Sequence, residues 1–214
     1  MLKFVTLSLL LGSVWLYAQA PIQHPYYQKK LYGFQQMKKN DLVFLGDSLT
    51  DFHDWSSFGA HHNAGIAGDT TDGLLYRLHY TLTKKPHTIV LMIGINDLLQ
   101  GVALTQIKQN YSKVLDALSE IDQLIILSTL PVIADAQTEQ INDNVIALNV
   151  FLKIEAKKRQ MDYVDLYIHF ANNNDGLQER YTVDGVHLND DGYLLWEDGL
   201  KKLLSPTVPS QKQF

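Results

Sequence analysis

The sequence of 214 residues contains no cysteine. The chain therefore cannot form disulfide bonds, coordinate a metal through thiolates or carry a lipid on an N-terminal cysteine. We expect its stability to come from a hydrophobic core, since hydrophobic residues make up 46% of the sequence and charged residues 19%. These proportions are typical of a globular protein and argue against a disordered chain.

Large clusters of basic residues are also absent. The formal net charge is −5, and the longest group of consecutive basic residues is Lys157-Lys158-Arg159. This triplet falls at the end of a predicted helix, where cations interact favourably with the helix dipole. A nucleic-acid-binding domain normally carries a basic patch. We therefore expect no nucleic-acid partner.

An extended apolar segment occurs at the N-terminus, where Phe4 to Tyr17 follow Lys3 and precede Ala18-Gln19-Ala20. This pattern is typical of a secretory signal peptide that is cleaved after Ala20. An uncleaved anchor helix is the alternative, but the apolar run is shorter than the roughly 20 residues that a membrane span needs. We therefore expect export to the periplasm or the medium and no stable membrane anchor.

The remaining chain predicts one globular domain over residues 21–204 and a polar, frayed tail over residues 205–214. Short apolar runs and a glycine-rich segment indicate five strands, which are Leu42–Leu45, a short strand within residues 61–69, Thr88–Ile93, Leu124–Leu127 and Tyr163–Leu166. Helical spacing of apolar residues indicates helices between them, which are Tyr26–Lys39, one from Thr70 or Thr71 to Pro86, Thr105–Ile121, Asn142–Arg159 and one from Asn189 or Asp190 to Leu203.

Alternating strands and helices predict an α/β fold. The expected form is a three-layer α/β/α sandwich with a mostly parallel sheet of about five strands. Right-handed crossovers place the carboxyl ends of parallel strands, and the loops that follow them, at one edge of the sheet. Side chains in those loops should therefore lie close together.

Small polar residues follow several of the predicted strands at that edge. They are Ser48, Gly68, Asn96, and, before the last helix, Asp184 and His187. Four of these residues have a structural alternative. Ser48 could cap a helix, Asn96 could form an Asx turn or cap a helix, Asp184 could be a turn residue beside Gly185, and His187 could have a purely structural role. For Asp47, Asp69 and Asp97 we expect hydrogen bonds to loop amides and no catalytic role.

Together these residues fit acyl transfer, which needs a nucleophile, a base, a group that orients the base and donors for an oxyanion. Ser48 can be the nucleophile and His187 its base. Asp184, three residues before His187, can hold the imidazole in the required tautomer. The backbone amides of Ser48 and Gly68 and the side-chain amide of Asn96 can donate to the oxyanion.

Four segments resemble the SGNH (GDSL-type) esterase and lipase superfamily, in the family's order. They are Gly46–Leu49, Asn63–Asp69, Gly94–Asp97 and Asp184–His187. The resemblance implies a flavodoxin-like SGNH hydrolase fold and hydrolysis of carboxylic esters without a metal or organic cofactor. It also implies a triad of Ser48, His187 and Asp184, with an oxyanion hole formed by Ser48, Gly68 and Asn96.

Within the superfamily, the sequence looks most similar to the branch of platelet-activating-factor acetylhydrolase subunits. Ile95 departs from that branch, in which threonine is common at this position. The Gly-x-Ser-x-Gly nucleophile elbow is absent, which argues against the other large fold of serine esterases.

The substrate is less defined by the sequence. No long apolar insertion is present to shelter a fatty chain, so we expect short acyl groups, such as acetyl esters of carbohydrates or small alcohols. Lysophospholipid or thioester hydrolysis at the same site is an alternative, and a non-catalytic carbohydrate-binding module on this scaffold is another. Residues Ala134–Gln140 and the loop Asn172–Tyr181 are the candidate lid segments.

Overall fold

The computed structural model describes residues 21–36 and 42–204. The expected signal peptide and the expected frayed tail therefore lie outside the described residues, as does the predicted end of the first helix at Lys39. Among the helices of the described ranges, none combines the length and the apolar character that crossing a bilayer would require.

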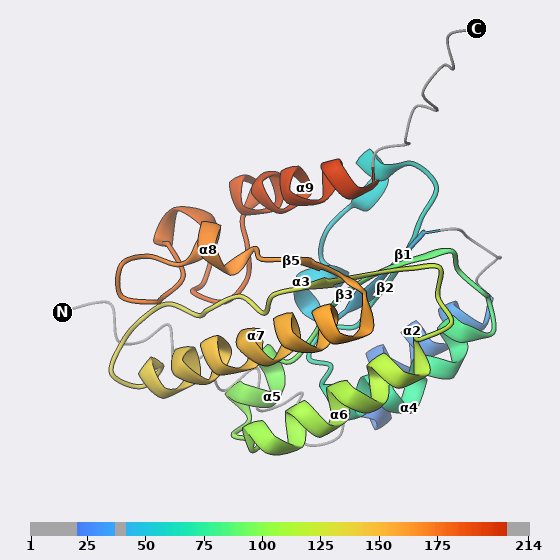
Figure 1. The fold of residues 1–214 in the computed structure, drawn as a ribbon, viewed down its shortest axis with the longest axis horizontal. Helices are drawn as coiled ribbons and strands as arrows, with labels where there is room; N and C mark the ends of the chain where they lie inside the picture. The colour runs from blue at the N-terminus through green and yellow to red at the C-terminus, as the bar shows by residue number, and fades with distance from the viewer. Residues whose placement is uncertain (1–20, 37–41, 205–214) are drawn as a thin grey trace, which may run out of the picture.

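Five parallel strands form a single sheet at the centre of the molecule (Figure 1). The spatial order is β2-β1-β3-β4-β5, with β1 at Leu42–Gly46, β2 at His62–Gly65, β3 at Thr88–Met92, β4 at Gln123–Leu127 and β5 at Asp162–Val164. Every pair of neighbouring strands is parallel. The predicted class, a three-layer α/β/α sandwich with a five-stranded sheet, is confirmed.

Helices cover both faces of this sheet. The helical segments are η1 (Pro21–Gln23), α2 (Pro25–Gln35), α3 (Ser48–Asp51), η2 (Trp55–Phe58), α4 (Thr71–Leu82), α5 (Ile95–Leu99), α6 (Leu104–Ala117), α7 (Glu139–Arg159), α8 (Tyr167–Phe170), η3 (Glu179–Tyr181) and α9 (Asp190–Leu204). Helices α2, α4, α6 and α7 follow one another across the lower face in Figure 1, and α9 lies on the opposite face.

Two short helices, α5 and α8, were not predicted from the sequence. With five and four residues, they are too short for a helical period to be recognised. Helix α7 also begins at Glu139 rather than at Asn142, because Asp135 and Thr138 form a turn in which the Thr138 hydroxyl accepts a hydrogen bond from the Asp135 amide at 2.9 Å.

An aromatic cluster fastens α9 to the sheet beside the end of β1. Phe44 of β1 stacks on Trp55 with ring centroids 4.2 Å apart, and Trp55 meets Trp196 of α9 edge-on at 5.2 Å. Tyr193, also of α9, donates its hydroxyl to the carbonyl of Leu49 at 3.0 Å. Because α9 is fixed to α3 in this way, the loop that precedes α9 is held over the carboxyl end of β1.

Candidate active site

Ser48 is the first residue of α3, directly after the turn that ends β1. The turn needs a glycine at position 46, since a Cβ there would lie 2.3 Å from the carbonyl oxygen of Met92. Asp47, and not Ser48, caps the helix, because its Oδ1 accepts a hydrogen bond from the amide of Leu49 at 3.0 Å. The Ser48 hydroxyl is therefore not used as a cap.

That hydroxyl faces His187. The His187 Nε2 lies 3.0 Å from Ser48 Oγ, and His187 Nδ1 lies 2.7 Å from Asp184 Oδ2. A carboxylate at Nδ1 fixes the tautomer in which Nδ1 carries the proton and Nε2 presents its lone pair. The structure thus brings the three residues of the predicted triad into one hydrogen-bonded line.

The Asp184 carboxylate is held by its own loop. Burial raises its pKa, but the hydrogen bonds from the His187 ring and from the amides of His187 and Val186 outweigh burial and leave the pKa below its usual value. Gly185 has φ +94°, and a Cβ there would lie 2.8 Å from the Ile133 side chain. Only glycine suits this position, so Asp184 is both a turn residue and the partner of His187.

The predicted oxyanion donors also lie together. Gly68 has φ +80° in a turn that is closed by a hydrogen bond from the Asp69 amide to the Ile66 carbonyl at 3.1 Å. Asn96 Nδ2 donates to the Asp69 carbonyl at 2.9 Å, and its second hydrogen remains for another acceptor. Within the described ranges, the backbone amides of Ser48 and Gly68 donate to no other residue.

The chain belongs to the GDSL-like lipase/acylhydrolase family. The model of that family matches residues 44–195, which contain all the site residues described above. The family resemblance that the sequence indicated is thereby confirmed.

Solved structures share the acylhydrolase fold. A protein from Streptococcus pneumonia, provisionally described as a platelet activating factor, superposes with a TM-score of 0.76 at 22% identity, covering 92% of this chain and 98% of that one. A GDSL-like lipase from Bacteroides thetaiotaomicron gives a TM-score of 0.68 at 22% identity over 91% and 98% of the two chains. Axe2, an acetylxylan esterase from Geobacillus stearothermophilus, gives 0.66 at 20% identity over 79% and 97%.

The chain also matches part of a larger curated protein. It is 26% identical over 168 residues to an N-acylneuraminate cytidylyltransferase of Streptococcus agalactiae, which covers 75% of this chain and 40% of that protein. The chain thus spans less than half the length of these curated relatives, and the likeness concerns that part of them alone.

Three buried carboxylates fix the loops around the candidate active site. As predicted, Asp47 accepts from the Leu49 amide, Asp69 from the Thr70 amide and Asp97 from the Thr71 amide. Burial raises the pKa of Asp47 to about 7 and that of Asp97 to about 6. Asp47 Oδ2 is buried without a hydrogen-bond partner in the described part of the chain. These groups order the loops from inside the protein.

Arg77 of α4 was not identified from the sequence. Its fully buried guanidinium donates from Nε to Asp69 Oδ2 at 2.7 Å, from one terminal nitrogen to the Ala64 carbonyl at 2.8 Å and from the other to the Gly46 carbonyl at 2.9 Å. One side chain thus joins the ends of β1 and β2 to the Gly68 turn. The available signal was a lone arginine on the apolar face of α4, three residues after Leu74.

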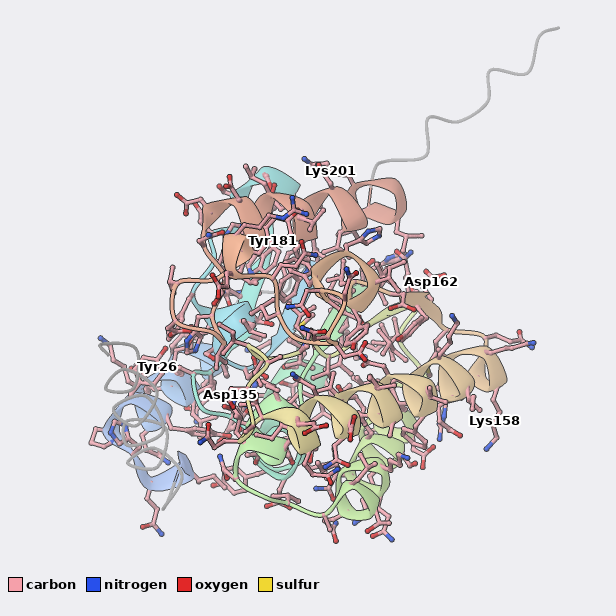
Figure 2. The ribbon with its side chains drawn as sticks, turned by 90° about the vertical axis from the view of Figure 1, so that its left-hand side faces the viewer. Tyr26, Asp135, Lys158, Asp162, Tyr181 and Lys201 are labelled. Atoms are coloured by element: carbon pink, nitrogen blue, oxygen red, sulfur yellow. The ribbon has the colours of Figure 1, made fainter. Side chains whose placement is uncertain are left out.

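The two candidate lid segments lie against each other, since a Cβ at Gly176 would lie 2.6 Å from the amide nitrogen of Ala134. Residues from both line a pocket of about 300 Å³, which are Ala134, Asp135, Ala136, Glu139, Asn142, Asp143, Asn174 and Asp175. The amide of Ile133 donates to the Gly185 carbonyl at 2.8 Å, so the pocket adjoins the Asp184–His187 loop. Figure 2 labels Asp135 and Tyr181, one residue from each segment. The pocket lining is polar and largely acidic.

Proposed function

We propose that this acylhydrolase is an exported serine esterase that removes short acyl groups, above all acetyl groups, from carbohydrates or small alcohols. The reaction would proceed through an acyl-Ser48 intermediate. His187 Nε2 would take the proton from Ser48 Oγ as that oxygen bonds to the acyl carbon, and would return it to the departing alcohol. Water would then repeat the sequence and release the acid.

The observation that carries this proposal is the line of two hydrogen bonds, 3.0 Å from Ser48 to His187 and 2.7 Å from His187 to Asp184. A serine hydroxyl that serves only as a helix cap or a packing group needs no such pair behind it. In the oxyanion hole, the amides of Ser48 and Gly68 and the side chain of Asn96 would stabilise the charge that develops on the carbonyl oxygen.

Two features near the triad support a small or polar substrate. Phe52 is 59% exposed, and the centroid of its ring lies 5.4 Å from the centroid of the His187 ring. It offers a flat apolar surface large enough for a sugar ring or a short acyl group. The acidic pocket beside the Asp184–His187 loop would not hold an alkyl chain, because burying apolar groups among carboxylates gains little. The fold shared with an acetylxylan esterase agrees with this choice.

The acyl-chain preference can be measured with nitrophenyl esters from acetyl to palmitoyl, together with an acetylated xylo-oligosaccharide. We expect kcat/KM to be highest for the acetyl ester and to fall at least about tenfold by the octanoyl ester, because each added methylene must find space that the site does not provide. Equal or higher kcat/KM for palmitoyl would contradict the proposal and favour a lipase or lysophospholipase.

Export can be tested by expressing the full chain in a bacterial host and sequencing the N-terminus of the product. We expect the mature protein to begin at Pro21, in the periplasm or the medium. Replacing Ala18 by aspartate should block cleavage, because signal peptidase sites need a small residue there. Recovery of the intact chain from Met1 in the membrane fraction would instead support the anchor-helix alternative.

A further inference from the structure

Helix α2 ends before the region that the family model matches, residues 44–195. The helix packs on the domain through Tyr27, Leu31 and Phe34, which are all buried. Two consecutive tyrosines at its N-terminal end, Tyr26 and Tyr27, each direct a hydroxyl to a carboxylate near the Gly68 turn. Tyr26 is labelled in Figure 2.

The first carboxylate is Asp51, at the end of α3. Its side chain is 5% exposed, and one oxygen accepts from Lys30 Nζ of α2 at 2.6 Å. The other oxygen accepts from the Tyr26 hydroxyl and from the backbone amide of Ala67 at 2.9 Å. Two groups of α2 therefore fix the carboxylate that holds the residue directly before Gly68.

The second carboxylate is Asp69, directly after Gly68. The Tyr27 hydroxyl lies 3.2 Å from Asp69 Oδ1 and 3.0 Å from the carbonyl oxygen of Gly73. The same aspartate carries the ion pair with Arg77, whose guanidinium lies over the Phe34 ring of α2 at 5.5 Å. Helix α2 therefore also contacts the other side of the Gly68 turn.

We propose that α2 is a positioning element for the oxyanion hole. Tyr26 and Lys30 act through Asp51 on Ala67, and Tyr27 acts through Asp69, so that the two residues on either side of Gly68 are fixed by one helix. None of these groups touches the substrate. This inference rests on the proposed role of the Gly68 amide as an oxyanion donor.

The kinetic consequence follows from what an oxyanion hole does. A preorganised donor stabilises the charge that appears in the transition state more than the neutral carbonyl of the bound ester. A donor that is free to shift by a fraction of an ångström loses part of that advantage. Loosening the Gly68 turn should therefore lower kcat and leave KM nearly unchanged.

The test uses Tyr26→Phe, Tyr27→Phe and the double variant, which remove the hydroxyls and keep the rings. Tyr80→Phe is the matched control, because the Tyr80 hydroxyl accepts from Gln35 Nε2 at the other end of α2, 3.4 Å away. With an acetyl ester, we expect kcat to fall about threefold in each single variant and about tenfold in the double variant, with KM within twofold of the parent. Tyr80→Phe should keep the parent kcat.

A second readout separates positioning from general loosening. Methylboronic acid forms a tetrahedral adduct with an active serine and occupies the oxyanion hole, so its inhibition constant should rise by the same factor as kcat falls. If Tyr27→Phe does not fold, Tyr26→Phe and Lys30→Gln still test the Asp51 side of the helix. The inference is wrong if kcat in the folded variants stays within twofold of the control, or if kcat falls while the boronic acid binds unchanged.

The failure of this inference can be told apart from failure of the proposed function. If Ser48→Ala retains the parent kcat, the serine mechanism and this inference both fall. If Ser48→Ala is inactive and the tyrosine variants match the Tyr80→Phe control in kcat and in boronic acid binding, only the role of α2 falls.

Discussion

Replacing Ser48 by alanine is expected to lower kcat for an activated acetyl ester by about 10⁴-fold or more, leaving the slow rate that binding and the oxyanion donors alone provide. The reason is that the acyl intermediate cannot form without Oγ, and a water molecule at this place would not be held 3.0 Å from His187 Nε2 in the way the hydroxyl is. Purified Ser48→Ala and parent proteins should be assayed side by side, with ester substrate at saturating and at low concentration.

The matched control is Ser128→Ala. Ser128 also lies just past the carboxyl end of a strand, β4, and is fully buried, but its Oγ accepts a hydrogen bond from the amide of Tyr167 at 2.8 Å. Losing it should cost about 1 kcal/mol of stability and leave kcat unchanged. Melting curves should be similar for Ser48→Ala and the parent. A Ser48→Ala protein that turns over at the parent rate would refute the proposed nucleophile.

The position of the reactive groups was predictable because it depends on local signals. Ser48 and Asn96 each follow a short apolar strand, Gly68 follows a glycine-rich one, and the carboxyl ends of parallel strands meet at one edge of the sheet. Asp184 and His187 are three residues apart, so one tight turn suffices to bring carboxylate and imidazole together. The strand and helix alternation likewise predicts the sheet without any knowledge of long-range contacts.

Contacts between segments that are distant in the sequence could not be predicted, because no local sequence pattern indicates them. The sequence left open whether Ser48 caps a helix, and only the structure shows that the Asp47 side chain takes that place. Arg77 lies on the apolar face of α4, but no local pattern indicates its three acceptors, which come from β1, β2 and the Gly68 turn. The Asp69 carboxylate that accepts from the Tyr27 hydroxyl is 42 residues away in the sequence, so no local pattern indicates this contact.

Replacing Arg77 by methionine is expected to lower the free energy of unfolding by about 3–5 kcal/mol at neutral pH. Methionine fills a similar volume, but it leaves the Asp69 carboxylate buried without its counter-ion and removes one donor from each of the carbonyl oxygens of Ala64 and Gly46. The matched control is Arg159→Met. In the parent, the Arg159 guanidinium pairs with Glu155 at 2.9 Å, and the Arg159 side chain is 21% exposed. That loss should cost under about 1 kcal/mol, because solvent screens a surface pair.

Urea unfolding of the Arg77→Met protein at pH 8 and pH 5 tests the electrostatic origin of the loss. Burial raises the pKa of Asp69, and the Arg77 guanidinium opposes that rise in the parent. Without Arg77, the folded-state pKa of Asp69 should rise further above the unfolded value of about 3.9. A carboxyl with a raised folded pKa destabilises the fold as the pH rises, so the deficit of the variant relative to the parent should shrink from pH 8 to pH 5. The pKa values of Asp47 and Asp97 are raised as well, but we expect their contributions to the pH dependence of stability to be similar in both proteins and therefore to cancel in the difference.

An equal deficit at both pH values would mean that lost packing, and not the uncompensated charge, dominates the effect.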